Sequence, residues 1–219
     1  MKIGIVCYPT YGGSGVVATE LGLALANNGH KVHFITYKRP PRLNSFHENI
    51  FFHEVASMEY PLFEFAPYET SLASKLVDVV KYEDLDLLHV HYAIPHAAVA
   101  YMAKQILEAH GKFIPFITTL HGTDISLVGT DASFSPVVEF SINNSDGVTA
   151  VSKQLKQMTL DSFNITTDIR VIYNFIDFSR FKKANKDHFK KAIAPDGEKI
   201  LVHTSNFRKV KRVDDVIYI

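Results

Sequence analysis

The chain has 219 residues, 47% of them apolar and 21% charged, and its 23 basic side chains balance 23 acidic ones. This composition excludes a disordered chain, and the balanced charge gives no overall field that would attract nucleic acid or an anionic membrane. No apolar run approaches the roughly 20 residues of a membrane helix, so we expect a cytoplasmic protein with small-molecule partners. The single cysteine, Cys7, lies in the first apolar run, where we expect it to be buried without a redox role.

Short apolar runs alternate with segments of helical length along most of the chain. These runs are Lys2–Tyr8, Lys31–Thr36, Ile50–Val55, Asp86–Tyr92, Phe113–Leu120, Gly147–Val151 and Ile169–Tyr173. Among the helices between them, Gly15–Asn28 is closed by Gly29. A second helix, Pro95–His110, opens with proline and stops at a glycine. The alternation predicts an α/β fold, a Rossmann-like doubly wound parallel sheet whose ligands bind at the carboxyl ends of the strands.

The composition shifts after Asn174, where lysines become frequent and apolar residues rare. We therefore predict a first domain over residues 1–176, a linker over 177–198 and the start of a second domain over 199–219. That second unit is expected to hold one strand, Lys199–Thr204, and the opening of a helix at Val213–Ile219, too little to cover its own apolar faces. The expectation is a truncated second domain and a chain that folds but is inactive by itself.

The glycine-rich segment YPTYGGSGVVATELG follows the first predicted strand and opens the first predicted helix. Within it, Gly13–Ala18 matches G-x-G-x-x-A, so bare backbone N–H groups at a helix N-terminus could hold an anion, although a purely structural turn fits equally well. Four extra residues before this fingerprint, and no acidic residue after the second strand, disfavour NAD. Lys38 and Arg39 at that place leave an NADP-dependent oxidoreductase open as an alternative.

Histidines and hydroxyls gather at two later strand ends. The segment LHVHYAIPH puts His89 and His91 on one face of a strand, with His96 at the next helix start. A metal there is disfavoured against packed or substrate-facing histidines, because Asp124 is the one nearby carboxylate and the chain has no H-E-x-x-H or cysteine partner. The segment TTLHGTD indicates ligand contact, and the alternative is a turn in which Asp124 or Thr123 caps the segment that follows.

A basic cluster in the segment SNFRKVKR follows the predicted strand of the second unit. Its cations would suit a phosphate group at a ligand-facing turn. A nucleic-acid patch or a localisation signal is disfavoured by the balanced net charge, and simple solvation of the cluster stays open.

In chain order, the segments CYPTYGGSGVVATELG, LHVHYAIPH, TTLHGTD, TAVS, VIYNFID and SNFRKVKR strongly resemble the retaining GT-B glycosyltransferases of family four. The resemblance spans the whole chain. It implies two Rossmann-like domains that face each other across a cleft, with the acceptor mainly on the first and the nucleotide sugar mainly on the second. The glutamate pair that the family places on the second domain has no counterpart before Ile219.

For the donor, the resemblance implies that Gly13 and Gly15 lie beside the diphosphate and that Arg208 and Lys211 neutralise it from the second domain. His121 would contact the donor sugar as the catalytic residue. No metal and no other cofactor is implied, because the cations replace a metal at the departing phosphate.

For the acceptor, the resemblance implies transfer of N-acetylglucosamine from UDP-N-acetylglucosamine to L-malate, with retention. The implied acceptor contacts are Ser14, Tyr92, Thr119 and Asn174. These two small molecules are the expected partners, and association into a homo-oligomer stays open. A non-catalytic module that binds a sugar or a carboxylate is the remaining alternative.

Overall fold

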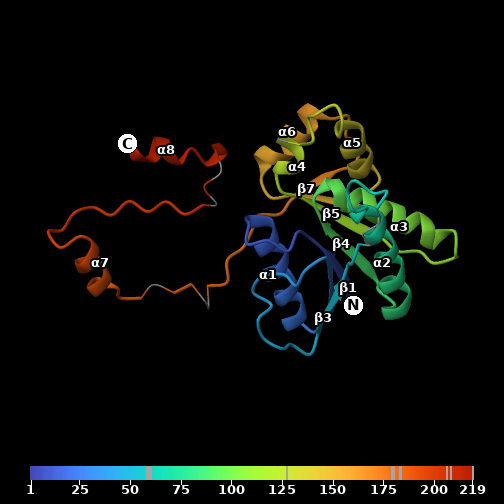
Figure 1. Cartoon of the computed structure of the whole chain (residues 1–219), viewed down its shortest axis with the longest axis horizontal. Coiled ribbons are helices and arrows are strands. Elements are labelled where there is room, and N and C mark those ends of the chain that lie inside the picture. The colour runs from blue at the N-terminus through green and yellow to red at the C-terminus, as the bar shows by residue number, and fades with distance from the viewer. Residues whose placement is uncertain are drawn as a thin grey trace. The chain divides into compact units, whose positions relative to one another are not determined.

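The computed structural model describes residues 1–57, 61–126, 128–178, 181–182, 184–205, 207 and 209–218. The chain divides into two compact units, Met1–Asn174 and Phe175–Ile219, which we call unit 1 and unit 2. Figure 1 shows their helices and strands, coloured along the chain.

Unit 1 is built on a seven-stranded parallel sheet with the strand order β3-β2-β1-β4-β5-β6-β7 (Figure 1). The strands are β1 (Lys2–Val6), β2 (Lys31–Thr36), β3 (Ile50–Glu54), β4 (Leu87–His91), β5 (Phe116–Leu120), β6 (Gly147–Ala150) and β7 (Ile169–Val171). All seven strands predicted within the first domain form, and the predicted fold class is confirmed. The chain order reverses between β1 and β4, which is where ligands bind in doubly wound sheets.

Helices cover both faces of the sheet. They are α1 (Gly13–Asn27), α2 (Tyr68–Glu83), α3 (Ala98–Glu108), α4 (Thr123–Ser126), α5 (Ser135–Asn143) and α6 (Lys153–Ser162), with a short π-helical turn η1 (Ala93–Ala97) before α3. Alternation along β1 sends Ile5 into the core beneath α1 and Val6 into the core beneath α2 and α3. Figure 1 accordingly shows α1 on one side of the sheet and α2 and α3 on the other.

Both predicted helices form, with shifted starts. The first begins at Gly13 rather than Gly15, and the second has the π-helical turn before α3 begins at Ala98. The glycines that we expected to end them, Gly29 and Gly111, have φ angles of 83° and 75°, so each occupies the left-handed conformation that glycine adopts most easily.

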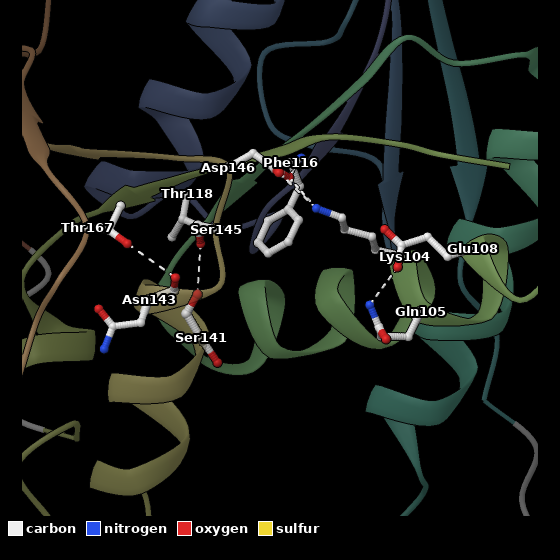
Figure 2. Close-up of polar contacts among 10 residues, drawn as sticks. All are labelled: Lys104, Gln105, Glu108, Phe116, Thr118, Ser141, Asn143, Ser145, Asp146 and Thr167. Carbon is white, nitrogen blue, oxygen red and sulfur yellow. Dashed lines mark hydrogen bonds and ion pairs between the residues drawn. The ribbon is translucent and has the colours of Figure 1, made fainter.

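Polar contacts fasten the amino ends of β5 and β6 (Figure 2). The carboxylate of Asp146 accepts hydrogen bonds from Lys104 Nζ of α3 at 2.8 and 2.9 Å and from the backbone N–H of Phe116 at 2.9 Å. The hydroxyls of Thr118 and Ser145 lie 2.8 Å apart in the interior. Asp146 and Phe116 are at the edge of the sheet opposite the carboxyl ends, so these contacts support the fold and leave the ligand edge to other residues.

Unit 2 contains α7 (Asp187–Ile193), a 3-10 turn η2 (Lys209–Lys211) and α8 (Val213–Ile217). The predicted strand Lys199–Thr204 was wrong, because these residues form no strand in the described structure and Leu201 and Val202 are exposed. A single strand leaves its backbone N–H and C=O groups without a neighbour, so an apolar run alone does not make one. Among the described helices of both units, none combines the length and the apolar character needed to cross a membrane.

Candidate functional site

The loop from β1 to α1 is folded back against the start of its own helix. A Cβ atom on Gly15 would lie 2.6 Å from the backbone oxygen of Tyr8 and would overlap the backbone oxygen of Thr10. The glycine is therefore required by close packing of backbone within the loop. Gly13 differs, because it is exposed and a Cβ there would have no other atom within 4 Å.

The N-terminus of α1 is suited to an anion. The first turn runs Gly13-Ser14-Gly15-Val16 and carries no charge, and its N-cap, Gly12, has no side chain to satisfy the first N–H groups. The first N–H groups of any helix lack partners within it, and the helix dipole adds positive potential at this end. A carboxylate or phosphate oxygen is the kind of ligand that such an end attracts.

Tyr92 follows β4 in a backbone conformation that a bulky residue rarely adopts, with φ of 87° and ψ of 139°. Its hydroxyl donates to Ser14 Oγ at 2.7 Å, and its backbone N–H donates to the backbone oxygen of Thr119 at 3.0 Å. Its ring centroid lies 5.4 Å from that of Tyr8 and 5.2 Å from that of His121. Contacts from the segments after β1 and at the end of β5 thus fix a strained residue at the point where the strand order reverses, a feature common at functional sites.

His91 and His121 form a hydrogen-bonded pair, with His91 Nδ1 and His121 Nε2 2.8 Å apart. Burial, aided by the neighbouring histidines, lowers the pKa of His121 to about 4 and holds that of His91 well below its usual range. Both rings are therefore neutral near neutral pH, so one donates to the other. His89 stacks on His91 with centroids 4.8 Å apart, which confirms the prediction that the two lie on one face of the strand.

His96 is completely buried beneath this pair. Its Nδ1 lies 2.5 Å from the backbone oxygen of His91, and since a carbonyl only accepts, His96 Nδ1 carries the proton. Its Nε2 then holds a lone pair that has no hydrogen-bond partner. Burial lowers the pKa of His96 from 6.5 to about 4, which keeps the ring neutral.

Asp124 shapes the loop that carries His121. Its buried carboxylate accepts hydrogen bonds from the backbone N–H groups of Ala93 at 3.0 Å, His121 at 3.2 Å and Gly122 at 2.9 Å. Burial raises the pKa of Asp124, and these three bonds oppose the rise. Asp124 does not cap the segment that follows it, because its carboxylate accepts from backbone N–H groups that precede it in the chain, and it thereby ties the loops after β4 and β5 together.

The family model for Glycosyltransferase Family 4 matches residues 11–180. The chain belongs to Glycosyltransferase Family 4. It is 51% identical, over 99% of its own length, to the N-acetyl-alpha-D-glucosaminyl L-malate synthase of Bacillus anthracis, of which it covers 56%. The chain thus spans about half the length of this curated relative.

Solved glycosyltransferase structures share the fold of this family 4 chain. Sucrose-phosphate synthase from Thermosynechococcus elongatus superposes with a TM-score of 0.65 at 15% identity, over 89% of this chain and 52% of that one. A glycosyltransferase from Rickettsia africae gives 0.63 at 21% identity, over 89% and 48%. These matches place the Rossmann-like sheet of unit 1 within about half of a GT-B chain. The chain belongs to a family of glycosyltransferases, so the oxidoreductase alternative is not retained.

The structure brings together several of the residues that the family 4 resemblance singled out. Ser14 and Tyr92 are hydrogen bonded, His121 packs on Tyr92, and Gly13 and Gly15 lie at the same helix end. Each comes from a loop at the carboxyl ends of β1, β4 or β5.

Other predicted residues lie elsewhere or are engaged. The Thr119 hydroxyl is buried between His89 Nε2 at 2.7 Å and Thr149 Oγ1 at 2.8 Å. Asn174 is exposed and is the last residue of unit 1. Lys211 is exposed in η2 of unit 2, and Arg208 lies outside the described residues.

Three of the side chains weighed as metal ligands are held by hydrogen bonds within the protein, whereas the buried Nε2 atoms of His91 and His96 have no hydrogen-bond partner among the residues that the structure describes. His89 bonds to Thr119, His91 bonds to His121, and the Asp124 carboxylate holds three backbone N–H groups. They act as a hydrogen-bonded frame for the loops of the site.

Two features of this site were missed from the sequence. The ring centroid of Tyr8 lies 4.6 Å from that of His96 and 5.4 Å from that of Tyr92. Tyr8 therefore joins the loop after β1 to the segment after β4. Its place directly after an apolar run, within the glycine-rich segment, was the available signal. The strained backbone at Tyr92 could not be predicted, because a tyrosine gives no indication of a positive φ angle.

Proposed function

We propose that the protein to which this chain belongs transfers N-acetylglucosamine from UDP-N-acetylglucosamine to L-malate with retention, the first step of bacillithiol biosynthesis, and that unit 1 binds the acceptor. The observation that carries this proposal is the 51% identity, over 99% of the chain, to a relative that is named as the L-malate synthase. Transfer activity is proposed for a protein of that relative's length, because the chain covers 56% of it.

The geometry of unit 1 suits an acceptor with two carboxylates and one hydroxyl. At the uncharged N-terminus of α1, the backbone N–H of Ser14 would serve a carboxylate, and those of Gly13 and Gly15 are left for the donor diphosphate. The hydrogen-bonded hydroxyls of Ser14 and Tyr92 stand beside this helix end, and a hydroxyl group of this kind can donate to a carboxylate or accept from the acceptor hydroxyl. Thr119 and Asn174 complete the proposed acceptor set, Thr119 by holding the His89 ring in place.

On the donor side, Gly13 and Gly15 would offer backbone amides to the diphosphate, with Arg208 and Lys211 as the matching cations. In the transfer step the malate hydroxyl oxygen forms a bond to the anomeric carbon while the bond to the phosphate oxygen breaks. That departing phosphate oxygen accepts the proton of the malate hydroxyl, and UDP leaves carrying it. Fixed cations and amide dipoles stabilise the charge that develops on the phosphate, and we propose that no metal or other cofactor is needed.

His121 would hold the donor sugar in place. Its pKa of about 4 keeps the ring neutral, and His91 fixes the ring by the 2.8 Å bond between Nδ1 and Nε2. A neutral imidazole can donate or accept a hydrogen bond with a sugar hydroxyl without adding charge next to the leaving group. Positioning of this kind brings the two substrates together in a reactive orientation.

The test is a UDP-release assay with UDP-N-acetylglucosamine and L-malate. It is run on the 219-residue chain alone and on the chain joined to the part of the Bacillus anthracis relative that it does not cover. We expect malate-dependent UDP release from the joined protein and none from the chain alone. Binding of L-malate without UDP release by the joined protein would instead identify a non-catalytic carboxylate-binding module.

A further inference from the structure

A second histidine cluster lies on the opposite face of the sheet from His89 and His91. His33 is on β2 and His53 on the edge strand β3, and the parallel register pairs Ile35 with His53. Ile35 packs into the core beneath α2, so both histidines are on the face that α2 covers. Glu83, the last residue of α2, joins them.

The three side chains converge. His33 Nδ1 and His53 Nε2 are 2.9 Å apart, and their rings stack with centroids 5.2 Å apart. One ligand atom from each of His33, His53 and Glu83 lies within 4.8 Å of the other two, the one such group of three found in the part of the chain that the structure describes. Phe51 stacks on the outer side of the His33 ring at 4.7 Å and limits how that ring can turn.

His33 has hydrogen-bonding capacity that the protein does not use. Only 1% of its surface is exposed, and its Nε2 has no hydrogen-bond partner although Nδ1 is bonded to His53. The bond between His33 and His53 places one proton between Nδ1 and Nε2, and an ion held by these two nitrogens would take the place of that proton. The unused Nε2 lies on the other side of the His33 ring, where it can carry the ring proton while Nδ1 binds the ion.

We propose that His33, His53 and Glu83 form a binding site for one divalent transition-metal ion of the zinc type. Two imidazoles and a carboxylate are ligands that zinc and its neighbours in the first transition series accept, whereas Mg²⁺ and Ca²⁺ prefer sets of oxygen ligands. With metal–nitrogen bonds of about 2.0–2.1 Å, two ligands on a tetrahedral ion lie about 3.3 Å apart. The observed 2.9 Å between the ring nitrogens has to widen only slightly, and water would complete the coordination.

The charges around the cluster make Glu83 decisive. Lys2 and Lys31 act as positive charges on the His33 ring and Lys75 on the His53 ring, and Lys2 Nζ donates to the backbone oxygen of Glu83 at 2.8 Å. The positive charge of these lysines disfavours the binding of a metal cation beside the two rings. The carboxylate of Glu83 is the group in the cluster that offsets them, so the affinity for the ion depends on its charge.

A bound ion would connect β2, the edge strand β3 and the end of α2. Ligands that bind only the folded state stabilise it, and metal sites act in this way when their ligands come from separate elements. The proposed ion is structural and takes no part in the transfer step.

The test is calorimetric titration of the 219-residue chain with ZnCl₂ after chelator treatment and dialysis, alongside its thermal unfolding. We expect one ion per chain and a higher Tm with zinc, and no response to MgCl₂. Since His33 is fully buried, the variants are His53→Gln and Glu83→Gln, at half-buried positions. Each is expected to weaken zinc binding roughly tenfold or more, as loss of a charged or strongly bonded ligand does.

Matched control variants distinguish this site from other histidine and carboxylate side chains that could bind zinc. Glu48→Gln and His110→Gln replace exposed residues of the same types and are expected to bind zinc as the wild type does. Zinc binding that is unchanged in His53→Gln and Glu83→Gln overturns the proposal. So does binding that survives in those variants and disappears in His121→Asn, because the ion then belongs to the other histidine cluster. Circular dichroism establishes that each variant is folded.

Discussion

Replacing His96 with asparagine is expected to remove a measurable part of the acid sensitivity of unit 1. The ring is 0% exposed, and burial lowers its pKa from 6.5 to about 4. The asparagine amide can occupy the place of Nδ1–H and still donate to the His91 oxygen, while the titratable ring is lost. Loss of the ring contact with Tyr8 lowers stability at every pH, so the informative quantity is the dependence on pH.

The sign of the effect follows from the direction of the pKa shift. Between pH 6.5 and about 4, the unfolded chain binds a proton at residue 96 that the folded chain does not. The contribution of His96 to stability is therefore present above pH 6.5 and lost as the pH falls toward 4. The full difference corresponds to about 3 kcal/mol, of which about 2 kcal/mol is lost between about pH 7 and about pH 4.5.

The assay is urea unfolding followed by far-UV circular dichroism, because the chain contains no tryptophan. Between those two pH values, the free energy of unfolding should fall by about 2 kcal/mol more in the wild type than in His96→Asn. His110→Asn is the matched control, since the exposed ring of His110 also places Nδ1 near a backbone oxygen, that of Ile106, at 2.7 Å. It should follow the wild type. Equal pH dependence in the wild type and His96→Asn would refute the reasoning.

Four further predictions concern the site. Gly15→Ala should lower Tm clearly, because its Cβ meets the loop backbone, whereas Gly13→Ala should leave Tm unchanged; equal effects in thermal scans would contradict this assignment. Tyr92→Phe removes the bond to Ser14 and should reduce the free energy of unfolding by about 1 kcal/mol in urea titrations, with no change counting against that bond. Asp124→Asn places an amide N–H, which cannot accept, opposite backbone N–H donors, and should lower the free energy of unfolding by about 1–3 kcal/mol in the same measurement. An unchanged free energy of unfolding would show that the loop does not depend on the carboxylate. Chelation by EDTA should leave the UDP-release rate of the joined protein unchanged, and a loss restored by Mg²⁺ or Mn²⁺ would show that transfer needs a metal.

Most of the fold of unit 1 was predictable because a buried parallel strand needs a continuous apolar run, and each run in the first 174 residues had a neighbour to pair with. Strand ends were less accurate. Phe113 extends the fifth run but is exposed, and β5 begins at Phe116. The run Lys199–Thr204 failed as a strand because pairing depends on residues far away in the sequence.

The site was predictable in its residue types and less so in its contacts. Ser14, Tyr92 and His121 were named from the family resemblance, but the bond between Ser14 and Tyr92 joins residues 78 positions apart. His91 pairs with His121 because the register sets His91 opposite Thr119 at the ends of adjacent strands. Such registers and the positive φ of Tyr92 depend on the assembled sheet, which local sequence patterns do not encode.

The proposed function places the acceptor site at the loops after β1 and β4 of unit 1. Calorimetric titration of the 219-residue chain with L-malate tests it most directly, beside Ser14→Ala and Tyr92→Phe and with Ser126→Ala as the control at an exposed serine. We predict that the wild type and Ser126→Ala bind L-malate alike and that the other two variants bind it roughly tenfold more weakly, as loss of one hydrogen bond to a charged ligand produces. Equal binding by all four proteins, or no binding by the folded wild type, would contradict the account.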